Sequence, residues 1–131
     1  MSKYKPLLFP DGGGGVAPTL ALDQLGWAGS GLKRPECVLA MRSGTLLSAD
    51  WDAVIARTDE SGRTVKFGDA IAPGRPSRPN GIALDARGRL LFADLGDTHG
   101  GLFRLDDAGG VELVADEVDG VAIPPSNFVL C

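Results

Sequence analysis

Short apolar runs separated by turn-forming residues follow one another along most of the chain. Each run has the length of a β-strand and is too short for a typical helix. The runs lie at 36–41, 45–50, 53–58, 63–67, 80–85, 89–94, 101–106 and 111–115. Glycine-containing segments such as Arg42-Ser43-Gly44 and Ala86-Arg87-Gly88 separate them,. The pattern predicts eight short strands joined by tight turns.

The first 30 residues do not share this pattern, and we expect them to form an N-terminal extension, 1–30, that is partly flexible. A short helix is conceivable only around residues 19–25, where Thr19 would cap a small apolar face,. The run Gly12–Gly15 is read as a linker. A phosphate-binding loop would require a preceding strand and a following Lys-Ser or Lys-Thr pair, and the sequence has neither there,.

The strand pattern is a repeat. ECVLAMRSGTLLSAD, from Glu36, aligns with NGIALDARGRLLFAD, from Asn80, so that Gly44 meets Gly88 at an offset of 44 residues. The alignment continues, after a three-residue insertion, from 54–65 onto 101–113. Four strands in a unit of about 40–50 residues are typical of a β-propeller blade. The first strand of each unit is almost continuously apolar, which predicts packing on both faces.

A third unit begins in SNFVLC, where Asn127 stands at the repeat position of Glu36 and Asn80. The predicted fold is therefore all-β, an incomplete β-propeller over residues 31–131, with two four-stranded blades and the first strand of a third. Closed propellers have about four to eight blades, so two blades do not close a ring by themselves.

The shared repeat position of Glu36, Asn80 and Asn127 precedes the innermost strand of each blade. Side chains there point toward a propeller axis, so the three are expected to converge at one end of the channel. Carboxylate and amide oxygens are the ligands that a hard cation such as Ca²⁺ selects. The alternatives are structural: Asn80-Gly81 is a common turn dipeptide, and Asn127 can cap a loop.

Three segments resemble the N-terminal portion of the SMP-30/gluconolactonase/LRE-like (regucalcin-like) family of six-bladed propeller hydrolases. They are GLKRPECVLA, RPNGIALDARGRLLFAD and GLFRLDDAGGVELVADEVDGVAIPPSNFVL, and together they span about residues 31–131. The resemblance implies that Glu36 and Asn127 bind a divalent cation, with Ca²⁺ expected first and Zn²⁺ or Mg²⁺ as alternatives. It also implies that Asn80 and Asn127 contact the substrate.

The chain departs from the family at two points. It has Ser-Asn-Phe at 126–128 where the family commonly has Pro-Asn-Asp. The family's second metal-binding Asn and its catalytic Asp come from later blades, which these 131 residues do not include. No catalytic residue is therefore assigned in this chain.

Two functions follow from this reading. The first is a metal-dependent hydrolase of a sugar lactone or similar ester, represented by its N-terminal portion and inactive alone. The alternative is a non-catalytic partial propeller or binding scaffold that self-associates, because an unclosed sheet offers unpaired N–H and C=O groups at its edges.

Composition and net charge restrict the classes of binding partner that are expected. Thirteen basic and 17 acidic side chains give a net charge of −4, which disfavours nucleic acid as a partner,. No apolar stretch approaches membrane-spanning length, so no membrane partner is expected,. Cys37 and Cys131 lack the spacing of a metal or redox motif, which favours a reducing cytoplasm,.

The remaining polar and aromatic candidates have structural interpretations. Asp50 and Asp94, at the ends of corresponding strands, are expected to bond the backbone. His99 is expected in an exposed loop, and Trp27 and Trp51 are expected to pack.

Overall fold

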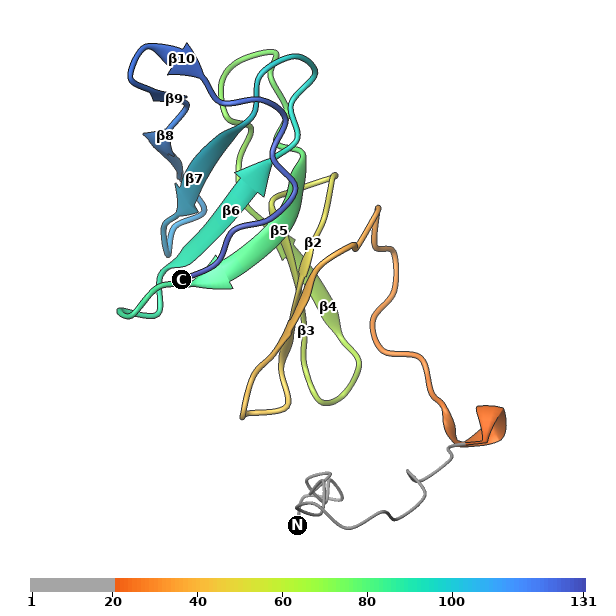
Figure 1. Ribbon diagram of the computed structural model, residues 1–131. Coiled ribbons are helices and arrows are strands. Elements are labelled where there is room, and N and C mark those ends of the chain that lie inside the picture. The colour runs from red at the N-terminus through yellow and green to blue at the C-terminus, as the bar shows by residue number, and fades with distance from the viewer. Residues whose placement is uncertain (1–20) are drawn as a thin grey trace, which may run out of the picture.

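The computed structural model describes residues 21–131, and the segment 1–20, with Thr19 and the Gly12–Gly15 linker, lies outside that part (Figure 1). The described chain is all-β apart from one short 3₁₀ helix, η1 (Leu22–Gln24), at the place where a helix was conceivable. No helix within residues 21–131 is both long enough and apolar enough to span a bilayer.

The predicted eight strands form two antiparallel four-stranded sheets, each in sequential order. The first sheet contains β1 (Val38–Ala40), β2 (Leu46–Ala49), β3 (Ile55–Thr58) and β4 (Thr64–Phe67). The second contains β5 (Pro79–Leu84), β6 (Leu90–Asp94), β7 (Gly101–Leu105) and β8 (Val111–Ala115). A small hairpin, β9 (Glu117–Val118) and β10 (Val121–Ala122), follows. The architecture is that of two propeller-like blades, as the repeat predicted.

An Asp-x-x-Gly turn closes three of the hairpins in the same way. The carboxylates of Asp59, Asp85 and Asp106 each accept hydrogen bonds from the backbone N–H groups two and four residues later. The fourth residue of the turn has a positive φ, 75° at Gly88, which glycine adopts without steric cost,. The backbone N–H of Arg89, above all, holds the pKa of Asp85 below its usual value, so the turn is bonded by an ionised carboxylate,.

One hydrophobic cluster joins the two blades. It draws Leu47, Ala49, Val54 and Ile55 from the first blade and Ile82, Leu90, Phe92, Phe103 and Leu105 from the second. β1 and β2 of the first blade contact β5 of the second. The core therefore lies largely between the sheets, and each blade supplies part of the surface that the other buries.

A buried aspartate ends the second strand of each blade, as the sequence predicted. Asp50 Oδ2 accepts the backbone N–H of Lys33 at 2.8 Å, and Asp94 Oδ1 accepts that of Arg78 at 2.7 Å. Both aspartates have no exposed surface. Each aspartate thus holds the segment that precedes its blade against the end of a central strand. The contact is present in both blades.

Three expectations differ from the structure. Residues 127–131 form no strand, because none of the described strands pairs with them. β5 is buried on both faces, but β1 is not, and Val38 is 52% exposed because the first blade is covered on one side only. Trp27 is fully exposed and does not pack, since it lies in an irregular segment ahead of β1, whereas Trp51 is half-buried.

Candidate functional site

The candidate site lies at the start of β5, where the strand is irregular. Pairing with β6 shifts between Pro79 and Ile82, so that two residues of β5, Asn80 and Gly81, lie opposite the single residue Ala93 of β6. Asn80 and Gly81 occupy this bulge. A bulge redirects side chains out of the regular alternation of a strand, and here the Asn80 side chain turns toward the C-terminal segment.

Asn80 and Asn127 meet directly. Asn80 Nδ2 donates to Asn127 Oδ1 at 2.7 Å, and it also lies 3.4 Å from the backbone oxygen of Asn127. Gly81 permits the approach, because a Cβ at this position would lie 2.7 Å from the oxygen of Asn127 and 2.6 Å from the Cα of Phe128. In Figure 1 the C-terminal segment runs beside β5 and ends near it. The structure thus brings together two of the three residues that share the repeat position.

The other amide atom of Asn80 has no partner. Asn80 is 2% exposed, and its Oδ1 is the one side-chain N or O atom in residues 21–131 that is both buried and without a hydrogen bond. A buried carbonyl oxygen left unbonded costs about 1–3 kcal/mol, and such atoms commonly mark a position for a bound water or ion. The hydrogen-bonding capacity of this oxygen is therefore unused within residues 21–131.

Glu36 lies beside this pair but is engaged by a cation of its own chain. Arg34 Nε donates to Glu36 Oε1 at 2.5 Å, and both side chains are nearly half exposed. The pKa of Glu36 is below its usual value, chiefly because of this hydrogen bond, and the amide of Asn80 lowers it further. Glu36 is consequently an ionised carboxylate at neutral pH, and the Asn80 side chain contributes to its lowered pKa.

These residues fit a hard cation in part. Ionised Glu36 and Asn127 Oδ1 are oxygen donors of the kind Ca²⁺ prefers, and a cation bound to Asn127 Oδ1 would displace the hydrogen bond that this atom accepts from Asn80. Within the described chain no three His, Cys, Asp or Glu side chains form a metal cluster, so a cation here would depend on amide oxygens. It would also have to compete with Arg34 for the Glu36 carboxylate.

Sequence reasoning missed the residues that connect Glu36 to the second blade. Arg34 lies over the Trp51 ring, with its guanidinium carbon 4.3 Å from the ring centroid, and Arg78 lies 5.7 Å from the same centroid. The Trp51 indole N–H donates to the Pro79 carbonyl at 3.2 Å. One signal in the sequence was visible: Arg34-Pro35 recurs as Arg78-Pro79 at the 44-residue offset. The stacking itself depends on the packing of the two blades.

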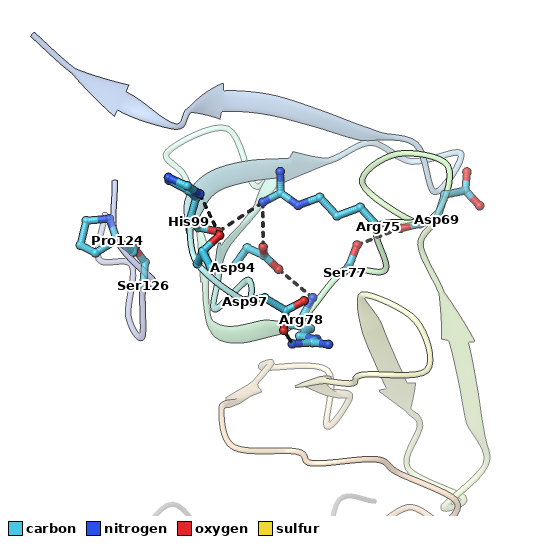
Figure 2. A network of polar contacts seen from close by, with 10 residues as sticks. Asp69, Arg75, Ser77, Arg78, Asp94, Asp97, His99, Pro124 and Ser126 are labelled. Carbon is cyan, nitrogen blue, oxygen red and sulfur yellow. Dashed lines mark hydrogen bonds and ion pairs between the residues drawn. The ribbon is translucent and has the colours of Figure 1, made fainter. Parts of the chain in front are cut away.

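A polar pocket adjoins the site on the second blade. The segment Gly74–Arg78 and the β6–β7 loop, residues 96–99, line it. Figure 2 shows Arg75 and Arg78 directed toward the buried Asp94 and toward Asp97. His99 is exposed in that loop, as predicted, and bonds Thr98.

Comparison with known families and proteins yields no match: no family model fits the chain, and no curated protein resembles it at a significant level.

Proposed function

We propose that this chain is the N-terminal, metal-binding portion of an SMP-30/gluconolactonase-like hydrolase of sugar lactones or similar esters. The observation that supports this most is the direct contact of Asn80 with Asn127, whose side-chain amides bond each other at 2.7 Å. The residue at this position in the first blade, Glu36, is an ionised carboxylate whose pKa the Asn80 amide helps to lower.

In this proposal Glu36 and Asn127 hold a divalent cation, with Ca²⁺ preferred and Zn²⁺ or Mg²⁺ as alternatives. When bound, such an ion polarises the carbonyl of a lactone as a Lewis acid. Asn80 and Asn127 also orient the substrate through hydrogen bonds to its hydroxyl groups. The proposed location is the cytoplasm, consistent with Cys37 and Cys131 being free thiols,.

Hydrolysis adds water across the ester: the ring C–O bond breaks, and a hydroxy acid is formed. A carboxylate must activate the water, and the family resemblance assigns that carboxylate to a later blade. We therefore expect ion binding, but no lactone turnover, from the 131-residue chain.

Addition of Ca²⁺ is expected to raise the melting temperature of the chain. An ion present at 100 times its Kd stabilises the folded state by about 2.7 kcal/mol, which corresponds to a rise of several degrees for a domain of this size. Glu36→Gln should abolish the rise, because it removes the one charged ligand. Differential scanning fluorimetry with Ca²⁺, Zn²⁺ and Mg²⁺ in turn measures both.

Glu117→Gln is the matched control, because Glu117 is exposed on β9 and makes no ion pair with any residue in 21–131. It should respond to Ca²⁺ as the wild type does. A wild-type chain without any metal-dependent shift, or a Glu36→Gln variant with an undiminished one, would contradict the proposal.

A binding scaffold that self-associates is the second candidate, and exposed apolar side chains favour it. In the C-terminal segment Phe128 is 68% and Leu130 is 91% exposed, and Val121 on β10 is 71% exposed. Val121 lies in the β9–β10 hairpin, Phe128 and Leu130 lie in the segment that follows it, and half-exposed Val38 lies on the strand that begins the other blade. Apolar surface of this kind is commonly covered by a partner.

Sedimentation velocity tests this candidate. The apparent mass is expected to rise above 13.6 kDa with concentration, and Phe128→Ser should reduce the rise. Leu22→Ser is the control, since Leu22 is 85% exposed but lies in η1. A 13.6 kDa species at every concentration would exclude the scaffold reading.

A further inference from the structure

The pocket between the Gly74–Arg78 segment and the β6–β7 loop has a volume of about 310 Å³. Its lining is unusual for so small a chain, because two arginines reach it from one segment. The opposite side is formed by Gly96, Asp97, Thr98 and His99. Figure 2 shows the side chains of Arg75, Arg78, Asp97 and His99 around Asp94.

Each arginine uses only part of its hydrogen-bonding capacity within the chain. Arg75 Nη2 lies 3.3 Å from Asp94 Oδ2 and 3.5 Å from the backbone oxygen of His99. Arg78 bonds Asp97 through Nη1. A guanidinium has five N–H donors, so most donors of both groups are left unused by the described part of the chain. The two side chains are 43% and 34% exposed, and a ligand can reach them from solvent.

The two carboxylates that face the arginines differ in how firmly they are held. Asp94 has no exposed surface and accepts the backbone N–H of Arg78, so it stays in place when a ligand binds. Asp97 is 76% exposed, in a loop, and among residues 21–131 its side chain bonds only Arg78. An ion pair this exposed contributes little to stability. An incoming anion can therefore replace Asp97 on Arg78.

The net charge of the pocket after Asp97 is displaced indicates which charge a ligand should carry. With Asp97 displaced, Arg75 and Arg78 face the single negative charge of Asp94, so the pocket has a net charge of +1. A monoanion balances this charge, and a carboxylate also matches the fork of donors on a guanidinium. A dianionic phosphate would leave an excess negative charge beside the buried Asp94.

The pocket and the candidate metal site lie at the same end of the molecule. Arg78 is two residues ahead of Asn80, and its guanidinium lies near the same Trp51 ring as that of Arg34, which bonds Glu36. A ligand held by Arg78 is thus close to the amide side chain that the proposed substrate site uses.

We propose that this pocket binds the carboxylate group of a sugar acid, and that Asp97 occupies its place when no ligand is bound. For the substrate class the inference rests on the proposed function: the lactone would be that of a sugar acid bearing a second, free carboxylate. Binding of the carboxylate itself needs no metal.

Isothermal titration calorimetry of the full chain with D-glucuronate, in buffer containing EDTA, tests the proposal. We expect D-glucuronate to bind and neutral D-glucose to bind at least tenfold more weakly. Arg78→Gln should weaken glucuronate binding at least tenfold. Asp97→Asn should strengthen it by up to about fivefold, because the competing internal carboxylate is gone. Arg87→Gln, a change in an exposed hairpin turn, should leave the affinity unchanged.

Three results would overturn the proposal: equal affinity for glucuronate and glucose, wild-type affinity in folded Arg78→Gln, or tighter binding of inorganic phosphate than of glucuronate. Circular dichroism confirms that the variants are folded. Because EDTA is present, glucuronate binding without any Ca²⁺ response would refute the metal site and support the pocket. A Ca²⁺ response without glucuronate binding would refute the pocket alone.

Discussion

Phe92→Ala is expected to lower the free energy of unfolding by about 3–5 kcal/mol. Phe92, on β6, is completely buried, and its ring stacks on Phe103 with 5.5 Å between centroids. It belongs to the cluster that both blades share, so the cavity would open where the two sheets depend on each other. Domains of this size have a stability of about 5–15 kcal/mol, and the change would remove a large part of it.

Urea denaturation followed by circular dichroism and by tryptophan fluorescence measures this loss. Leu113→Ala on β8 is the control, since Leu113 is 49% exposed, and it should cost under 1 kcal/mol. The two probes should report one transition, because the two blades share one core. This holds although Trp51 belongs to the first blade and Phe92 to the second. A loss below 1 kcal/mol in Phe92→Ala, or separate transitions for the two probes, would show that the blades do not share a core.

Asp94→Ala is expected to have the next largest effect. The substitution leaves the part-buried backbone N–H of Arg78 without its acceptor, which alone costs up to about 3 kcal/mol,. It also removes the partner of Arg75, although that guanidinium is 43% exposed and solvent compensates part of the loss,. The Gly74–Arg78 segment should consequently detach from the end of β6.

Asp94→Asn separates the two contributions, because an amide oxygen still accepts the Arg78 N–H while the charge is lost. We expect it to be clearly less destabilising than Asp94→Ala in thermal melts. Asp97→Ala, in the neighbouring loop, should change stability by no more than about 0.5 kcal/mol. Equal losses for the alanine and asparagine variants would mean that the backbone hydrogen bond contributes nothing.

The strand framework could be predicted from the sequence because the repeat is local. The order of apolar runs, the Asp-x-x-Gly turns and the buried Asp50 and Asp94 all depend on contacts within one blade or its entry segment. The exposure of Val38 and the missing strand at 127–131 could not be predicted, because they depend on what lies against each blade. The amphipathic pattern of a strand distinguishes its two faces, but it does not identify which face another part of the molecule covers.

The candidate site, too, could be predicted from the sequence only in part. The repeat position predicted that Asn80 and Asn127 meet, and they do. It did not predict that Arg34 would bond Glu36, nor that Arg34 and Arg78 would both lie near the Trp51 ring. Arg34 and Arg78 share a repeat position at the 44-residue offset, but their common contact with Trp51 joins two blades, so comparing the units with each other does not reveal it.

The position of Trp51 has a spectroscopic consequence. The chain has two tryptophans, and Trp27 is fully exposed, so its emission is that of an indole in water and is insensitive to events at either site. Trp51 has cationic groups of Arg34 and Arg78 near its ring, one bonded to Glu36 and the other to Asp97. The field at its indole changes when either partner moves. One intrinsic fluorophore therefore reports on both sites, and no label is needed to follow them.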